Sequence, residues 1–305
     1  MRIGIIVLMN IKRHTYRKIL LVCLILNITG CLSRVKNITE ENFDGQRAYQ
    51  DVIHQVGLGA RYPGTQGHQQ LVEYLTVELE QAGWIVDRQI GSIEEKDVVN
   101  IIASRDDDPE YILLGAHYDN RMYADQDPVE SLRTGFVPGA NDGASGVAVL
   151  LELARTLPED LPVSTRLVFF DAEDNGGIEN WDWILGSRVF VRDMIPLPQS
   201  AIILDMIGDA DLQVYYERNS DPRIREQIWR AAHDLGYGNS FIKEERHSML
   251  DDHMPFLEVG IPAVDLIDFD YPYWHTTQDT VDKVSPESLQ VIGDTIGAWL
   301  SGLNE

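Results

Sequence analysis

Cysteine is nearly absent from this chain of 305 residues, because its two cysteines, Cys23 and Cys31, both fall within the first 31 positions. The rest of the chain therefore has neither a disulfide framework nor a cysteine metal site. Any metal bound there must be held by histidine, aspartate and glutamate.

Positive charge is also scarce. The chain has 25 Lys+Arg against 49 Asp+Glu, a formal net charge of −24. This balance argues against a nucleic-acid binder, which needs a basic face to neutralise phosphates. The simplest explanation for the acidity is solubility. With 44% hydrophobic residues and no low-complexity tract, the chain can bury a core, which excludes disorder as a description of the whole.

The first 31 residues resemble a targeting segment. Basic residues between Lys12 and Lys18 precede an apolar run over 19–28. This run is too short to span a bilayer as a helix, but it matches the hydrophobic region of a signal peptide. The small residues before Cys31 resemble a bacterial lipoprotein box, in which the cysteine is lipidated and becomes the new N-terminus. A plain secretory signal or an N-terminal anchor is the alternative.

This interpretation divides the chain into a signal peptide (1–31), a polar tether (32–44) and a folded domain (45–305), with Met1 or Met9 as the start. It predicts an exported protein, lipid-anchored to the outer face of a bacterial cell membrane or periplasmic. The only membrane contact expected is the lipid on Cys31, because no later stretch approaches transmembrane length. We expect a monomer.

From about Phe43 onward, strand and helix signals alternate. Continuous apolar runs are typical of strands buried on both faces, as in a parallel sheet covered by helices. Helices with apolar faces are expected between them. The sequence therefore predicts a single α/β domain with a mostly parallel, mixed central sheet and helices on both faces. The expected strands are 111–116, 167–170, 201–204 and 262–267, and the expected helices are 66–82, 147–157, 223–235 and 286–300.

Acidic residues and a histidine follow three of these strands. His117 follows the first, Glu173 and Asp174 the second, and Asp205 the third. In open α/β sheets, ligands bind beyond the carboxyl ends of the strands, so these side chains should meet at one rim. Two further elements are expected to join them, namely Asp142 in the glycine-rich run 139–146 and His275 after the aromatic run 271–274.

This combination of residue types indicates zinc. Carboxylate oxygens and neutral imidazoles without thiolate suit a catalytic zinc, where three protein ligands leave one position open. The glycines around Asp142 allow its short side chain to approach a metal. Because Glu173 and Asp174 are adjacent at a strand end, their side chains diverge. One can bind the metal while the other faces the substrate as an acid/base.

Each element alone also has a structural explanation. Asp142 could be a helix N-cap, and His117 could be a hydrogen-bonded core histidine. Their joint occurrence at matching strand ends favours the metal site. Other chemistries lack their motifs: the chain has no Gly-x-Ser-x-Gly nucleophile elbow, phosphate-binding loop, complete dinucleotide fingerprint or His-Glu-x-x-His helix.

With these residues the chain resembles a known superfamily, the zinc-dependent α/β exopeptidases. This superfamily contains the co-catalytic zinc aminopeptidases and the glutaminyl-peptide cyclotransferases of the animal type, with bacterial members. The resemblance covers roughly 57–300 and depends on several motifs taken together. These are Ala116-His117-Tyr118-Asp119, Gly139 through Gly146, Phe169 through Asp174, Gly186-Ser187-Arg188, Leu204 through Gly208, and Trp274-His275-Thr276.

The resemblance assigns a role to each matching position. It implies that Asp142, Asp174 and His275 are the ligands of the shared zinc and that Glu173 is the general acid/base. In the aminopeptidases, the positions of His117 and Asp205 hold a second metal, with Asp142 bridging. In the cyclases the same two residues persist beside a single zinc, and the counterpart of Asp205 joins a hydrogen-bonded network with the acid/base.

Several residues favour the cyclase branch. Asp251 matches a catalytic aspartate of the cyclases, Trp274 matches an indole that lines their substrate pocket, and Trp181 has a plausible counterpart there. One departure is Asp265, where the animal cyclases carry histidine. The segment 280–284 is instead common among aminopeptidases.

The predicted function is therefore a zinc-dependent glutaminyl-peptide cyclotransferase, which converts the N-terminal glutamine of peptides to pyroglutamate and releases ammonia. One zinc is expected. The alternative is a co-catalytic aminopeptidase with two zincs that removes N-terminal residues. Both act on peptides with a free N-terminus. A non-enzymatic binding protein would be expected to have lost a ligand or Glu173, and none is missing.

Overall fold

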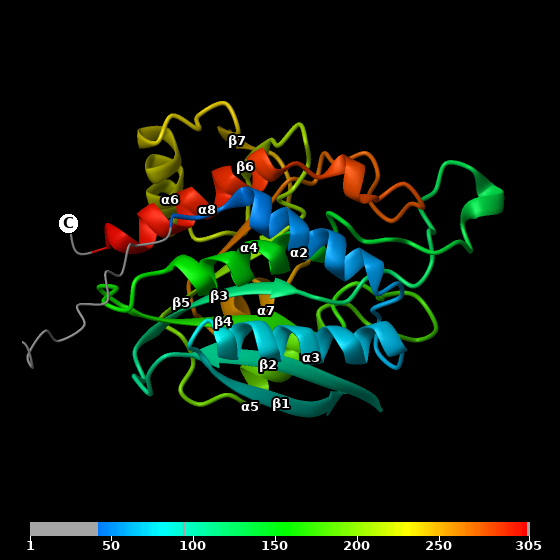
Figure 1. Ribbon diagram of the computed structural model, residues 1–305, viewed down its shortest axis with the longest axis horizontal. Helices are drawn as coiled ribbons and strands as arrows, with labels where there is room; N and C mark the ends of the chain where they lie inside the picture. Colours follow the sequence, from blue (N-terminus) through cyan, green and yellow to red (C-terminus); the bar gives the residue numbers. More distant parts are fainter. Residues whose placement is uncertain (1–41, 94, 304–305) are drawn as a thin grey trace, which may run out of the picture. The chain divides into compact units, whose positions relative to one another are not determined.

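The four apolar runs form four adjacent strands of one mixed sheet (Figure 1). In the computed structural model, which describes residues 42–93 and 95–303, strand β3 pairs in parallel with β4 and β5, and β5 pairs in parallel with β8. The prediction that these four runs belong to the parallel part of one mixed sheet is therefore confirmed. The strands are β3 (Tyr111–His117), β4 (Ser164–Phe170), β5 (Ser200–Asp205) and β8 (Ala263–Ile267).

An antiparallel hairpin that the sequence pattern does not predict extends this sheet beyond β4. It consists of β1 (Ile85–Ile93) and β2 (Lys96–Ser104), and the strand order is β1-β2-β4-β3-β5-β8. Strand β1 alternates between half-buried and exposed positions, so it lacks the continuous apolar run of a central strand. A separate pair, β6 (Val214–Tyr216) and β7 (Phe241–Glu245), forms a small second sheet.

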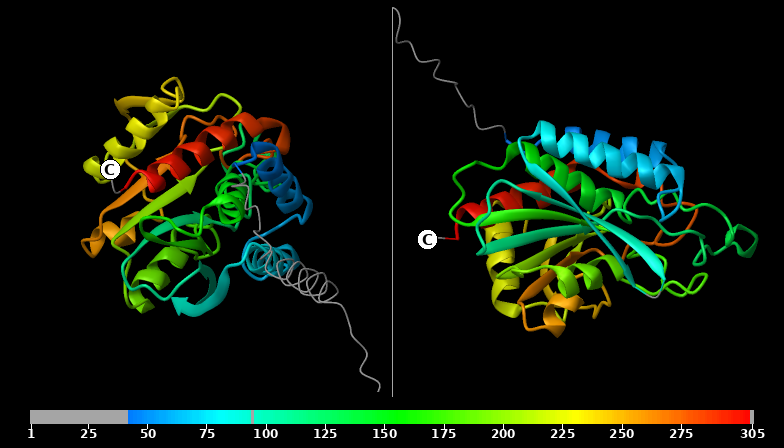
Figure 2. Two further views of the ribbon diagram at one scale, coloured as in Figure 1. Left: turned by 60° about the vertical axis from the view of Figure 1, so that its left-hand side comes forward. Right: turned by 90° about the horizontal axis from the view of Figure 1, so that it is seen from below.

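Helices cover both faces of the central sheet (Figure 2). On one face, α4 packs against β3, β4 and β5, and it also contacts α2, α3 and α8. On the other face, α5 packs against β1 and β2, and α7 packs against α5 and β8. Helix α6 contacts α8, β7 and β8. The bounds are α2 (Gly45–Gly57), α3 (Gln66–Gln81), α4 (Ala144–Thr156), α5 (Leu185–Asp193), α6 (Pro222–Asp234), α7 (Met254–Glu258) and α8 (Pro286–Ser301), with short 3₁₀ turns η1 (Glu130–Leu132) and η2 (Val281–Lys283).

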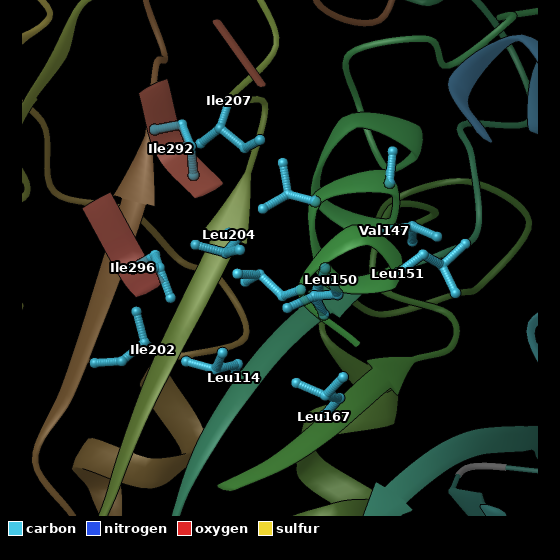
Figure 3. Packing of buried hydrophobic residues seen from close by; sticks show 14 of the residues in the cluster. Leu114, Val147, Leu150, Leu151, Leu167, Ile202, Leu204, Ile207, Ile292 and Ile296 are labelled. Carbon is cyan, nitrogen blue, oxygen red and sulfur yellow. The ribbon is translucent and has the colours of Figure 1, made fainter. Parts of the chain in front are cut away.

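The alternation of side chains along β3 divides the core into two clusters. Leu114 belongs to the cluster on the α4 face, together with Leu150 and Leu204 (Figure 3). Leu113 belongs to the cluster on the opposite face, together with Phe190 of α5 and Phe256 of α7. Because successive side chains of a strand point to opposite faces, a strand covered on both sides must be apolar throughout.

The start of the described chain is part of the fold. Phe43 is buried in the core, and Asp44 caps α2 by accepting hydrogen bonds from the backbone N–H groups of Gln46 and Arg47. The predicted signal peptide, Cys31 and most of the predicted tether lie outside the described residues, so these interpretations stay predictions. Within 42–93 and 95–303, no helix has both the length and the apolar composition needed to cross a bilayer.

Candidate metal centre and substrate cavity

Two parallel strand ends bring His117 and Asp205 together. His117 ends β3 and Asp205 ends β5, and both side chains are buried. The Nε2 atom of His117 lies 3.1 Å from Oδ1 of Asp205 and 3.2 Å from Oδ1 of Asp142. The first group of predicted ligands is therefore assembled at the carboxyl edge of the sheet.

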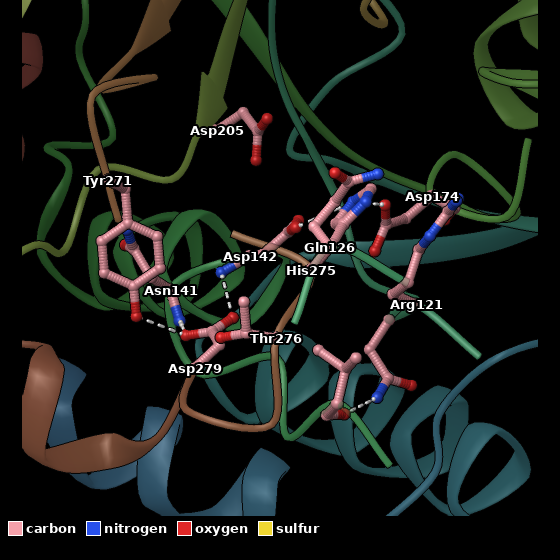
Figure 4. Close-up of polar contacts among 12 residues, drawn as sticks. Arg121, Gln126, Asn141, Asp142, Asp174, Asp205, Tyr271, His275, Thr276 and Asp279 are labelled. Carbon is pink, nitrogen blue, oxygen red and sulfur yellow. Dashed lines mark hydrogen bonds and ion pairs between the residues drawn. The ribbon is translucent and has the colours of Figure 1, made fainter. Parts of the chain in front are cut away.

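A second group forms around His275. Its Nε2 atom lies 2.7 Å from Oδ1 of Asp174 and 3.5 Å from Oδ2 of Asp142 (Figure 4). Asp142 thus directs one carboxylate oxygen to each histidine. In each group of three, the ligand atoms lie within 4.8 Å of one another.

Asp119 holds the acidic turn that follows β4. Its carboxylate accepts hydrogen bonds from the backbone N–H groups of Glu173 and Asp174, at 3.0 and 3.3 Å, and from the side-chain amide of Asn175 at 3.0 Å. Its backbone oxygen approaches Gly143 so closely that a Cβ atom there would lie only 2.5 Å away, and Gly143 also has a φ of +89°. A glycine is therefore required beside Asp142.

Asp279 fixes Asp142 from the other side. The backbone N–H groups of Asn141 and Asp142 donate to its two carboxylate oxygens, at 2.9 and 3.1 Å, and the hydroxyl of Tyr271 donates to it at 2.7 Å (Figure 4). Neither Asp119 nor Asp279 has a role predicted from the sequence. Their contribution depends on hydrogen bonds to distant backbone, which no local pattern indicates.

The electrostatics of this centre fit a bound cation. Burial raises the pKa of Asp174 to about 6, with Asp142 adding to the shift, and burial together with Asp251 raises the pKa of Asp205 to about 7. The Oδ2 atoms of Asp142 and Asp174 are buried without a hydrogen-bond partner. A divalent cation would offset the repulsion between these neighbouring carboxylates and would provide a partner for both Oδ2 atoms. A ligand set of imidazoles and carboxylates suits zinc.

Glu173 faces the same space without belonging to either ligand group. Burial raises its pKa well above the ordinary glutamate value, and the carboxylates of Asp174 and Asp251 add to this effect, although His117 opposes it. A glutamate with a raised pKa can both accept and donate a proton near neutrality. This arrangement suits the acid/base role predicted for it.

A cavity of about 210 Å³ lies against these residues. It contains both acidic and apolar wall segments, which is typical of a site that orients a small ligand through a few polar groups. Its walls are Asp142, Glu173, Asp174, Trp183, Asp205, Met249, Leu250, Asp251, Ile267, Phe269, Trp274 and His275.

Two indoles stand beside His275. The ring of Trp274 stacks on it with centroids 3.8 Å apart, and the ring of Trp183 lies nearly parallel to it at 6.0 Å. Trp181 is not on the cavity wall, because it packs against the apolar cluster of Leu185 with the Lys96 ammonium 4.5 Å from its ring. The structure thus favours Trp183 over Trp181 as the second aromatic wall. Nothing in the Trp-Asp-Trp run distinguishes the two indoles.

Arg121 and Asp125 support the centre from outside. The guanidinium of Arg121 pairs with Asp125 at 2.8 Å, donates to the backbone oxygen of Asp174 at 2.8 Å, and lies 4.8 Å from the ring centroid of Trp183. Oδ1 of Asp125 lies 3.6 Å from Nδ1 of His275, the ring nitrogen that faces away from the ligand group. Outer carboxylates of this kind orient metal-binding histidines. Neither residue could be predicted from the sequence, since charged residues in a loop carry no distinguishing pattern.

The chain is similar to known proteins over most of its length. The family model of peptidase family M28 matches residues 97–300. The glutaminyl-peptide cyclotransferase of Gloydius blomhoffii is 29% identical over 319 aligned positions, which cover 88% of this chain and 83% of that protein.

Solved structures are similar over most of both chains. A Zn-dependent exopeptidase from Parabacteroides distasonis superposes with a TM-score of 0.81 and 32% identity, covering 87% of this chain and 100% of the other. The glutaminyl cyclase of Tannerella forsythia superposes with a TM-score of 0.80 and 33% identity, covering 86% and 99%.

Proposed function

The chain belongs to peptidase family M28, and within that family we propose that it is a zinc-dependent glutaminyl-peptide cyclotransferase. It converts the N-terminal glutamine of a peptide to pyroglutamate and releases ammonia. The observation that carries this proposal is the cavity of about 210 Å³, whose wall contains Trp183 and Trp274 and places Glu173 beside the ligand groups. Its likeness to the glutaminyl cyclase of Tannerella forsythia supports the same activity.

The walls of the cavity suit a glutaminyl side chain. The two indoles and Ile267 offer apolar contact to its methylene groups, while Asp205 and Asp251 offer acceptors for its amide and amine N–H groups. A volume of about 210 Å³ accommodates one short side chain and its α-amine. The rest of the peptide then remains outside the cavity.

The chemistry divides between a metal and one carboxyl group. When bound by Asp142, Asp174 and His275, zinc supplies Lewis-acid polarisation of the γ-carboxamide oxygen. Glu173 accepts a proton from the neutral α-amine as its nitrogen forms a bond to the γ-carboxamide carbon. The carbon–nitrogen bond of the amide then breaks, and Glu173 returns the proton to the leaving nitrogen, which departs as ammonia.

A second candidate function is that of a co-catalytic zinc aminopeptidase. The observation that favours it is that both ligand groups are complete. His117 and Asp205 lie beside the shared Asp142 and could hold a second metal ion. In that reaction Glu173 would instead take a proton from the water that attacks the first peptide bond. Glu173 serves both reactions, so only products and metal content distinguish them.

Product analysis separates the two reactions. We expect the zinc-loaded protein to release ammonia from Gln-Ala, leave pyroglutamyl-alanine as the only organic product, and leave Leu-Ala intact. Mass spectrometry of the products and metal analysis of the same sample provide the measurement, with about one zinc per chain expected. Release of free glutamine or leucine by a protein with two zincs would establish the aminopeptidase instead.

The two tryptophans provide a matched pair of variants. We expect Trp183→Leu to lower kcat/KM for Gln-Ala by about 10-fold, equivalent to about 1.4 kcal/mol, because it removes one aromatic wall of the cavity. Trp181→Leu should stay within about twofold of the wild type, since the same change is made outside the cavity. Steady-state kinetics, with zinc measured in both proteins, test this. A larger loss of kcat/KM in Trp181→Leu than in Trp183→Leu would show that Trp181 is the substrate-binding residue.

A further inference from the structure

A second buried polar cluster lies behind the part of the cavity wall that contains Asp251. It is separate from both ligand groups. Its members come from the segment after β6, the start of α7 and the middle of β8. They are Glu217, Ser220, His253 and Asp265, and none is more than 3% exposed.

Glu217 is the fixed end of this cluster. Its carboxylate accepts hydrogen bonds from the backbone N–H groups of Asn219, Ser220 and Met249, at 2.9, 2.7 and 3.0 Å, and from the hydroxyl of Ser220 at 2.9 Å. Burial alone would raise its pKa, but His253 and these donors lower the pKa of Glu217 to about 2. Glu217 is therefore a carboxylate near neutral pH. Because Met249 lies on the cavity wall, Glu217 also anchors the segment that leads to Asp251.

His253 lies between Glu217 and Asp265 at ion-pair distance from both, with no hydrogen bond from either ring nitrogen to the described part of the chain. Its ring is fully buried, with Nε2 at 3.4 Å from Oε2 of Glu217 and Nδ1 at 3.8 Å from Oδ2 of Asp265. The two ring nitrogens thus face two different carboxyl groups. A buried histidine placed in this way can hold one acid in position relative to the other.

Asp265 connects the cluster to the cavity. It lies in the middle of β8, where its backbone N–H donates to the Ser220 hydroxyl at 3.0 Å, and neither of its carboxyl oxygens has a hydrogen-bond partner. Burial raises the pKa of Asp265 well above the ordinary value, and the charges of Asp251 and Asp205 add to this. Asp251 is joined to the cluster through the chain, because it stands two residues before His253 in a turn closed by a hydrogen bond from the Met254 N–H to the Asp251 carbonyl oxygen at 2.8 Å.

We propose that Glu217 and His253 are positioning residues for the reaction. Glu217 orients His253, His253 holds Asp265, and Asp265 keeps the carboxyl group of Asp251 directed into the cavity. This inference rests on the proposed function in taking Asp251 as a group that faces the substrate. The positioning role of Glu217 and His253 would be the same if the protein were an aminopeptidase that hydrolyses its substrate.

Two substitutions of His253 separate the two contacts. The amide nitrogen of glutamine can take the place of Nε2 and keep the contact with Glu217, whereas that of asparagine can take the place of Nδ1 and keep the contact with Asp265. We expect His253→Gln to lower kcat by about 10- to 100-fold, the size of effect typical of residues one step removed from a centre. His253→Asn should retain more activity. Zinc content and KM should stay within about twofold of the wild type in both.

The measurements use the zinc-loaded full chain, with His233→Gln as a control for the same chemical change at an exposed position. The wild type is first tested on Gln-Ala and Leu-Ala, and the variants are compared on whichever substrate it converts. A failure of the cyclase proposal then appears in the wild-type products, and a failure of the positioning proposal appears in the variants.

A crystal structure of His253→Gln provides a readout that needs no turnover, and we expect the Asp251 carboxyl to rotate away from the cavity. An unchanged kcat, or an Asp251 carboxyl that has not moved, would overturn the proposal. It would also be overturned if kcat fell equally in both His253 variants and in proportion to their loss of thermal stability. If the His253 variants do not fold, Asp265→Asn tests the same link with an isosteric change. A wild-type kcat in that variant would also overturn it.

Discussion

Replacing His275 with alanine is expected to remove zinc from the protein and to abolish turnover. A site with three protein ligands loses its geometry when one is removed, and metal affinity falls with it. Here the substitution would also leave Oδ1 of Asp174 without the imidazole that now lies 2.7 Å away. Asp142→Ala and Asp174→Ala should have the same effect. The measurement is zinc per chain after dialysis, together with activity before and after zinc is restored.

His117→Ala is the matched control for this prediction, because it removes a buried histidine but leaves Asp142, Asp174 and His275 complete. If one zinc is bound by those three residues, the His117 variant should retain it. A His275→Ala protein that remains fully active in metal-free buffer would overturn the assignment. Loss of one of two zincs in the His117 variant would instead support the co-catalytic alternative.

Glu173→Gln should have a different effect, retaining zinc and the fold but losing turnover. The amide has the size of the carboxyl group but cannot accept and return a proton, and a positioned acid/base contributes roughly 10²–10⁴-fold to the rate. Because Glu173 lies outside both ligand groups, its substitution leaves the metal ligands in place. Activity and zinc content measured on the same preparation test both parts of this prediction.

Glu179→Gln provides the control, since it makes the same change at an exposed position of the loop that follows Glu173. It should keep wild-type activity. If Glu173→Gln loses zinc as well as turnover, the roles of Glu173 and Asp174 are exchanged. In that event Asp174→Asn would be expected to keep the metal.

The parallel part of the sheet could be predicted because it depends on local composition. A strand buried on both faces must be continuously apolar, so the segments that became β3, β4, β5 and β8 were all identifiable. The β1–β2 hairpin was not, because β1 is a partly exposed edge strand without such a run, and the buried Asn100 interrupts the apolar residues of β2. Helices α2, α5 and α7 were missed as well, and the last two are short.

The gathering of candidate site residues followed from chain direction. His117 and Asp205 end neighbouring parallel strands, so their side chains had to lie at one edge of the sheet. Chain direction could not show that Trp183, and not Trp181, lines the cavity. That depends on which of the two indoles packs against the apolar cluster that contains Leu185. The roles of Asp119 and Asp279 depend on hydrogen bonds to backbone far away in the chain.

The sequence by itself therefore determined the chemistry available at this centre, since residue types and strand order decide which carboxylates and imidazoles meet. Only the tertiary structure decided how they are used. It placed Asp142 between His117 and His275, separated Glu173 from the ligand groups, and put the Glu217–His253 pair behind the cavity wall. These relations join residues far apart in sequence through side-chain packing and hydrogen bonds, and such contacts exist only once the elements have assembled.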